Sequence, residues 1–259
     1  MNSVNKTLYI PLYGKSYISK RGIILNDPKA EEIWAAEGFA LKGKSASKWL
    51  AFYMGMRAAV FDRWLIKQME SMPDAVVLHL GCGMDSRICR VGNAEHLWYD
   101  VDFPEVIAER KKYYQESGYY KMLSADVRMP DFPAEIDGKS AIVIMEGISM
   151  YLQGEDLRQL VTSLSKRFEN VALLMDCYTE FAAKASRYKN PINDVGVTEV
   201  YGLDDPKILE CSGLSFVREL SMTPFDMIGE LQGIERTVFK KLYAGRMAKK
   251  LYRLYEYRK

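Results

Sequence analysis

The spacing of apolar residues changes near residue 73 and divides the chain into two parts. From Ser45 to Ser71, apolar side chains recur every three or four positions between charged ones, a spacing that predicts an amphipathic helix. Upstream, Asp27 and Pro28 supply an N-cap and a first-turn proline for a helix that ends near Gly38. We therefore expect residues 1–73 to form a helical N-terminal cap.

Beyond residue 73, short apolar runs alternate with helical patterns. A helix with Pro104 in its first turn is expected to continue to Glu116, and an amphipathic helix is expected over Glu155–Phe168. Strands that alternate with helices indicate an α/β domain with a doubly wound, mostly parallel sheet, which we assign to residues 74–259. The runs that predict buried strands are Ala75–Leu80, His96–Asp102, Tyr119–Ser124, Ala141–Met145 and Val171–Cys177.

The part of the chain after Cys177 is more irregular. Its turn-rich residues 189–196 predict a loop on the substrate side, and we expect residues 188–203 to close over a substrate together with the N-terminal helices. The other expected elements are a helix that ends near Tyr188, a short helix around Pro206–Cys211, a strand around Leu214–Ser221 and a long helix from about Ile234. That last helix is rich in Lys and Arg, and we expect its basic face to be solvated.

Composition narrows the class of protein. With 259 residues, 48% of them hydrophobic, the chain can bury a full core, which excludes a disordered or fibrous protein. A net charge of +2 is too small for a protein that mainly binds nucleic acid. Neither a basic start followed by an apolar core nor an apolar run of about 20 residues occurs, so we expect no membrane partner and no export.

Cysteine and histidine are too sparse for a disulfide framework or a metal site. The four cysteines form no CxxC pair, and the only histidines are His79 and His96. We therefore expect a reduced, cytoplasmic protein without a metal, and the oligomeric state stays open. His79 lies within an apolar run and should be a packed core residue, whereas His96 lies at the wrong end of its strand for a site.

Two strand ends carry residues suited to a nucleotide-like ligand. Gly81 and Gly83 follow the first strand and allow a tight turn with close backbone approach. Asp102 ends the second strand, close to the separation of about 20 residues expected for an acid that binds ribose hydroxyls. Ser86 stands where a dinucleotide fingerprint has its third glycine, so a ligand with ribose and no pyrophosphate fits better than NAD. An NAD(P)-linked oxidoreductase remains an alternative.

Six segments along the chain form an ordered set of motifs: Asn26–Glu32, Met56–Asp62, Leu80–Arg87, Tyr99–Pro104, Ala125–Arg128 and Glu146–Leu152. In this order they resemble the leucine carboxyl methyltransferase family of S-adenosylmethionine enzymes, especially the branch of the tetracenomycin polyketide-synthesis O-methyltransferase. The similarity covers roughly residues 8 to 220. Met84 and Ser86 replace the Leu and Thr usual in this family's LGCGLDTR motif.

The resemblance implies a Rossmann-like class I methyltransferase with S-adenosylmethionine as its cofactor. Residue type alone allows two simpler alternatives, in which Arg57 is a solvated residue on the helix surface and Asp126 is a turn residue that caps the following segment. The roles implied by the resemblance are Arg57 on the cofactor's carboxylate, Gly81 and Gly83 along its amino-acid part, Asp102 on the ribose, Asp126 and Val127 at the adenine, Glu146 at the amino-acid end and Tyr151 on the active-site side.

These expectations predict an O-methyltransferase that acts on a small molecule, such as a polyketide or another secondary metabolite. A phenol needs a general base, most often a histidine, but no histidine follows His96. A carboxylate is already an anion, so it or an acidic hydroxyl is the expected acceptor. Methylation of a protein's C-terminal carboxylate and a non-catalytic binding protein remain alternatives, and Cys82 is a weak candidate for a reactive thiol.

Overall fold

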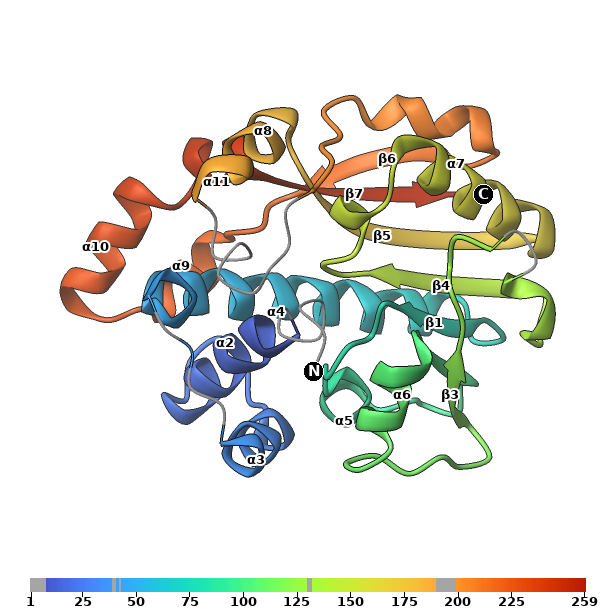
Figure 1. Ribbon diagram of the computed structural model, residues 1–259, viewed down its shortest axis with the longest axis horizontal. Coiled ribbons are helices and arrows are strands. Elements are labelled where there is room, and N and C mark those ends of the chain that lie inside the picture. Colours follow the sequence, from blue (N-terminus) through green and yellow to red (C-terminus); the bar gives the residue numbers. More distant parts are fainter. Residues whose placement is uncertain (1–7, 39–40, 42, 130–131, 190–198) are drawn as a thin grey trace.

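The computed structural model describes residues 8–38, 41, 43–129, 132–189 and 199–259. Their strands form one sheet in the order β3-β2-β1-β4-β5-β7-β6, in which β7 runs antiparallel to both β5 and β6 and the other adjacent strands are parallel (Figure 1). The strands are β1 (Val76–Leu80), β2 (Trp98–Asp102), β3 (Tyr120–Ser124), β4 (Ser140–Met145), β5 (Asn170–Tyr178), β6 (Ser215–Leu220) and β7 (Tyr252–Arg258).

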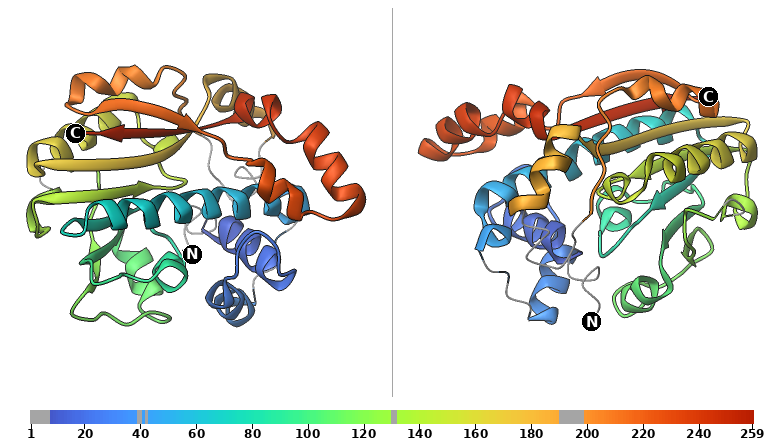
Figure 2. Two further views of the ribbon diagram at one scale, coloured as in Figure 1. Left: turned by 180° about the vertical axis from the view of Figure 1, so that it is seen from behind. Right: turned by 45° about the horizontal axis from the view of Figure 1, so that its top comes forward.

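Helices cover both faces of this sheet. The long helix α4 packs on one face, and α7 with the 3-10 helix η5 packs on the other (Figures 1 and 2). The α-helices are α2 (Tyr9–Lys20), α3 (Pro28–Glu37), α4 (Lys48–Ser71), α5 (Arg87–Val91), α6 (Pro104–Arg110), α7 (Gly154–Arg167), α8 (Glu180–Lys189), α9 (Phe225–Glu230), α10 (Gly233–Leu242) and α11 (Arg246–Leu251). The 3-10 helices are η1 (Gly43–Ala46), η2 (Phe132–Glu135), η3 (Ser149–Tyr151) and η5 (Pro206–Ser212).

The two helices expected in the N-terminal part are confirmed, together with the predicted Asp27 cap, and the structure adds α2 and a Ser47 cap that were not predicted. The Asp27 carboxylate accepts a hydrogen bond from the Ala30 backbone N–H at 2.9 Å, and Gly38 ends α3 in the left-handed conformation at φ 58°. Helix α4 starts after Ser47, whose hydroxyl accepts from the Trp49 N–H at 3.3 Å. The boundary that we propose at residue 73 lies in the turn between α4 and β1.

Alternation along the central strands divides the core between the two faces of the sheet. In β1, Val77 belongs to the cluster beneath α4, whereas Leu78 and Leu80 belong to the cluster beneath α7. All five residues of β1 are buried, as expected for a central parallel strand that helices cover on both faces. The predicted doubly wound α/β class is therefore confirmed.

The prediction of one long helix from about Ile234 to the end of the sequence is wrong. The structure instead has α10, a break at Gly245 with φ 57°, the short helix α11, and then strand β7. Leu251, Leu254 and Tyr255 do have helical spacing, but pairing outweighs it, because β7 hydrogen-bonds to β5 on one side and to β6 on the other. Both of its faces are buried, and its Glu256 carboxylate pairs with Arg218 at 2.7 Å.

Smaller differences concern the links between strands. The segment after β1 contains the short helix α5, where a turn alone was expected, and α6 ends at Arg110 rather than near Glu116. The predicted substrate-side loop falls mostly on residues 190–198, which lie outside the described residues. Across the described part of the chain, no helix has the length and apolar character needed to cross a bilayer.

Candidate active site

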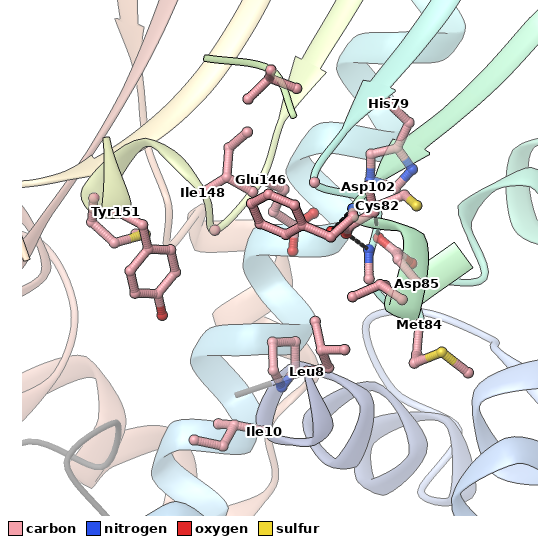
Figure 3. Close-up of a pocket in the computed structure, with 18 of the residues that line it drawn as sticks. Leu8, Ile10, His79, Cys82, Met84, Asp85, Asp102, Glu146, Ile148 and Tyr151 are labelled. Carbon is pink, nitrogen blue, oxygen red and sulfur yellow. Dashed lines mark hydrogen bonds and ion pairs between the residues drawn. The ribbon is translucent and has the colours of Figure 1, made fainter. Parts of the chain in front are cut away.

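The carboxyl ends of β1 and β4 open into a cavity of about 530 Å³. Strand order reverses between these two neighbours, and ligands of doubly wound sheets bind at such a switch point. Tyr151 and Asp102 lie on opposite sides of the cavity, and Leu8 and Ile10 at the start of α2 face it from the N-terminal side (Figure 3). All eight residues that the sequence analysis proposed for the site line this cavity.

Glycine is required where the first strand turns into the cavity. Gly81 has a φ of 64°, and a Cβ at this position would clash with Ile148. Gly83 has a φ of 50°, and a Cβ there would lie 3.0 Å from Leu8. Glycine at these positions thus allows the left-handed backbone and the close packing of Ile148 and Leu8, and both residues line the cavity.

Asp102 is fixed beside this turn by the backbone. Its Oδ2 accepts from the Gly83 N–H at 2.8 Å, and its Oδ1 accepts from the Phe103 N–H at 2.8 Å (Figure 3). Burial raises the pKa of Asp102, and these two hydrogen bonds oppose the shift. Within the described part of the chain, Asp102 forms no ion pair, so its remaining lone pairs are available to hydroxyl donors in the cavity.

Arg57 lies at the floor of the cavity rather than on the surface. Its side chain comes from α4 and is 3% exposed. Its Nε donates to Glu146 Oε1 at 3.0 Å, and its Nη1 donates to Asp176 Oδ2 at 2.7 Å. The solvated-helix alternative for Arg57 is therefore wrong.

Glu146, which follows β4, is ionised in this environment. Burial opposes its ionisation, but Arg87 and Arg57 outweigh the effect and lower its pKa to about 2. Arg87 is itself fully buried and also contacts Asp62 at 2.7 Å. Glu146 is therefore a fixed anion that faces the cavity and a poor proton acceptor.

Asp176 belongs to the same group of buried charges as Arg57 and Glu146, and the sequence analysis missed it. It lies in β5 and is fully buried, with Oδ2 on Arg57 and Oδ1 accepting from the Gly147 N–H at 2.6 Å. Burial raises its pKa, and Arg57 opposes the shift. The signal available in the sequence was an acid inside an otherwise apolar strand, since such a buried charge requires a partner.

Lys15 is a second residue that the sequence analysis missed. It is buried on α2, lines the cavity, and its Nζ lies 3.1 Å from Asp85 in the loop after β1. Burial opposes ionisation of Asp85, but Arg90 and Lys15 keep its pKa well below its usual range. The ion pair connects the N-terminal helix to the glycine turn, and an ammonium has further donors for a bound anion.

The far end of the cavity carries Asp126 and Val127, just after β3. Arg128 donates from its backbone N–H to Asp126 Oδ1 at 3.0 Å and from its side-chain Nε to the same oxygen at 2.9 Å. These bonds lower the pKa of Asp126. Tyr151, from η3, is 37% exposed and lies across the cavity from Asp102 (Figure 3).

Neither histidine is placed as a base. His79 is buried, with Nδ1 3.2 Å from Asp100 Oδ1 and Nε2 3.3 Å from an Arg87 nitrogen. His96 lies at the amino end of β2, where its Nδ1 is 2.7 Å from a backbone carbonyl oxygen. Burial raises the pKa of the Cys82 thiol well above its usual value, which disfavours a reactive thiolate. No cluster of His, Cys, Asp and Glu in the described ranges is arranged to hold a metal ion.

Comparison with proteins of known type agrees with this geometry. The chain is 28% identical over 244 residues to the tetracenomycin polyketide synthesis O-methyltransferase TcmP of Streptomyces glaucescens, which covers 92% of this chain and 90% of that protein. It is 23% identical over 235 residues to the S-adenosyl-L-methionine-dependent methyltransferase dpfgK of Gibberella zeae, which covers 81% of this chain and 78% of that protein.

A similar fold occurs in the magnesium protoporphyrin IX methyltransferase of Synechocystis PCC 6803, solved with bound SAH. The TM-score is 0.55 at 13% identity, over 95% of this chain and 97% of that one, and this likeness concerns the fold. Residues 12–165 match the family described as Leucine carboxyl methyltransferase. This match spans more than half of the sequence, so the chain belongs to the leucine carboxyl methyltransferase family and is an S-adenosylmethionine-dependent methyltransferase.

Proposed function

We propose that the protein methylates an oxygen of a small molecule, with a carboxylate as the acceptor. The observation that carries this proposal is the lack of a base: His96 lies outside the cavity against a backbone carbonyl, and His79, which lines the cavity, is held between Asp100 and Arg87. Glu146 is held as a stable anion by two arginines and is poorly suited to take a proton. A carboxylate needs no base near neutral pH, because it is already ionised.

The cavity fits the cofactor at both of its ends. The backbone of Gly81 and Gly83 forms part of the cavity wall, and the buried cations Lys15 and Arg57, which also line the cavity, suit the α-carboxylate of the cofactor. We propose that Glu146 faces the amino-acid end of the cofactor and that Asp102 accepts from its ribose hydroxyls. Gly83 would lie beside the amino-acid part, Asp126 and Val127 at the adenine, and Tyr151 on the acceptor side.

The protein's own contribution is to align the acceptor and to exclude water. When bound, S-adenosylmethionine supplies a methyl group on a sulfonium, so attack by an anionic oxygen neutralises charge as the O–C bond forms and the S–C bond breaks. Such a reaction depends on orientation more than on proton transfer. The apolar side chains that line the cavity, such as Ile10, Leu50 and Met150, favour a desolvated acceptor.

Product analysis tests the proposal. With the native acceptor, we expect an alkali-labile methyl ester and a rate that is nearly flat from about pH 6 to 8, because no group must lose a proton in that range. Replacing both His79 and His96 should affect stability more than turnover. An alkali-stable methyl ether, formed at a rate that rises tenfold per pH unit, would show that a hydroxyl is the acceptor instead.

A site of this kind could also methylate the C-terminal carboxylate of a protein. The relative TcmP favours a small molecule as the acceptor. TcmP is described as an enzyme of polyketide synthesis, and 92% of this chain aligns with 90% of it. We therefore favour a small secondary metabolite over a protein. Assaying the purified protein with metabolite extracts and with proteins of the same cell, using methyl-labelled cofactor, separates these two acceptors.

A further inference from the structure

Two neighbouring strands each place a carboxylate on the face of the sheet that α4 covers. Ile144 and Leu174 are partners in the parallel ladder of β4 and β5, and both belong to the core cluster beneath α4. Glu146 and Asp176 stand two residues further along, so alternation sends their side chains toward the same face. Arg57 of α4 contacts both carboxylates there, at 3.0 Å and 2.7 Å. Three distant segments of the chain therefore meet at the cavity floor.

The two carboxylates differ in their pairing. Glu146 is shared between Arg57 and Arg87, whereas Asp176 forms an ion pair with Arg57 and with no other cation in the described part of the chain. Burial opposes the charge of Arg57, but Asp176 and Glu146 outweigh this effect and raise its pKa, so the guanidinium stays charged. Asp176 therefore acts on a single guanidinium, that of Arg57.

Asp176 is itself held in place by the turn that follows β4. Its Oδ1 accepts from the Gly147 N–H at 2.6 Å, and its backbone carbonyl oxygen accepts from the Ser149 hydroxyl. Because the residue is also fully buried, its carboxylate has one orientation, in which Oδ2 is left for Arg57. Asp176 is thus a fixed anchor and not a mobile counter-ion.

The two carboxylates leave one nitrogen of the guanidinium for a ligand. Arg57 has five N–H donors, of which Glu146 uses the one on Nε and Asp176 uses one on Nη1. Among the described residues, none accepts a hydrogen bond from Nη2. This nitrogen lies beside Gly147, where a Cβ would come within 3.3 Å of it, and both Arg57 and Gly147 line the cavity. Nη2 is therefore the donor that a carboxylate in the cavity can reach.

We propose that Asp176 is a positioning residue for cofactor binding, which holds Arg57 in the orientation that presents Nη2 to the carboxylate of S-adenosylmethionine. This inference rests on the proposed function, which assigns Arg57 to that carboxylate. Asp176 is not among the residues that line the cavity, so it acts through Arg57 and does not touch the cofactor. Fixing a long side chain in advance removes the cost of ordering it when the ligand binds.

Two ligands that differ in their amino-acid part test the assignment by titration calorimetry. S-adenosylhomocysteine carries the α-carboxylate, whereas 5′-methylthioadenosine has the same adenine and ribose without the amino-acid part. Asp176→Asn keeps the size of the side chain and loses its charge. It should raise the Kd for S-adenosylhomocysteine about tenfold and change the Kd for 5′-methylthioadenosine less than twofold, because only the first ligand reaches Nη2. General damage to the cavity would weaken both ligands.

A second substitution shows whether Asp176 acts through Arg57. In an Arg57→Ala background, Asp176→Asn should change the Kd for S-adenosylhomocysteine less than twofold, because the side chain that Asp176 positions is absent. If Asp176→Asn does not fold, Gly147→Ala tests the same contact with every charge retained. Its Cβ would lie within 3.3 Å of Nη2, so the guanidinium must shift, and the Kd for S-adenosylhomocysteine should rise at least threefold.

Glu256→Gln is the matched control. Glu256 is also a buried acid, lies on the neighbouring strand β7 and pairs with Arg218 at 2.7 Å, outside the cavity. Its substitution removes one buried negative charge from the same sheet, as Asp176→Asn does. The Kd values for both ligands should stay within twofold of those of the unaltered protein.

The outcomes separate this assignment from the proposed function. A folded Asp176→Asn protein that binds S-adenosylhomocysteine within twofold of the unaltered protein overturns the assignment and leaves the cofactor site intact. Equal weakening of both ligands, a tenfold effect in the Arg57→Ala background, or an unchanged Kd for Gly147→Ala overturns it as well. If the unaltered protein binds 5′-methylthioadenosine as tightly as S-adenosylhomocysteine, the proposed contact of Arg57 fails, and this assignment fails with it.

Discussion

Replacing Arg57 with alanine is the most direct test of the cavity floor. The substitution removes the guanidinium that lies 3.0 Å from Glu146 and 2.7 Å from Asp176, and it leaves both carboxylates buried. Removing one partner of a buried ion pair costs about 3–5 kcal/mol. Because Glu146 keeps its contact with Arg87, we expect the free energy of unfolding to fall by about 3 kcal/mol. A domain whose free energy of unfolding is about 5–15 kcal/mol stays folded after such a loss.

The same substitution should weaken cofactor binding. Loss of a charge-assisted hydrogen bond to the cofactor's carboxylate costs about 1.5–3 kcal/mol, which raises the Kd for S-adenosylhomocysteine about 10- to 150-fold. Titration calorimetry measures the Kd, and urea unfolding measures stability on the same samples. Arg57→Lys should give an intermediate result, because an ammonium keeps the charge but cannot reach both carboxylates as a planar fork does.

Arg63 provides the control on the same helix. It pairs with Asp226 at the surface, where the two side chains are 51% and 60% exposed, so Arg63→Ala should change stability by less than about 1 kcal/mol and leave the Kd unchanged. The assignment of Arg57 would be refuted by a folded Arg57→Ala protein that binds S-adenosylhomocysteine within threefold of the unaltered protein. Equal weakening by Arg63→Ala would refute it as well.

Three further predictions follow from the same contacts. Asp102→Asn should weaken S-adenosylhomocysteine binding about tenfold with little loss of stability. Asp100→Asn should instead lower the free energy of unfolding by about 3 kcal/mol, because Asp100 is fully buried against Arg110. Calorimetry measures the binding and urea unfolding the stability, and equal binding losses in the two variants would contradict the assignment of Asp102. The pKa of Glu146 is lowered from 4.5 to about 2 in the folded protein, so its contribution to stability is complete above about pH 4.5 and is lost as the pH falls toward 2. Urea unfolding across this pH range should show a smaller loss of stability for Glu146→Gln than for the unaltered protein. The same dependence of stability on pH in both proteins would argue against the pKa shift. Deletion of residues 252–259 removes the strand between β5 and β6, and circular dichroism should show no cooperative melting; an unchanged melting temperature would contradict the role of β7 in the core.

The elements with strong local signals could be predicted from the sequence. The Asp27 cap, the period of α4 and the short apolar runs of the central strands are local features, and each element formed within a few residues of its expected bounds. The glycines after β1 and the acid at the end of β2 were found in the same way, because parallel strands place their carboxyl ends at one edge of the sheet. The family resemblance supplied Arg57 and Glu146.

Long-range pairing decided the rest. Leu251, Leu254 and Tyr255 have the spacing of a helix, and it is pairing with the open hydrogen-bonding edges of β5 and β6 that makes the extended form of β7 the stable one. Lys15 and Asp176 looked like an ordinary helix lysine and an isolated strand acid. Their roles depend on burial, which makes an unpaired charge costly and forces each of them against a partner from a distant segment.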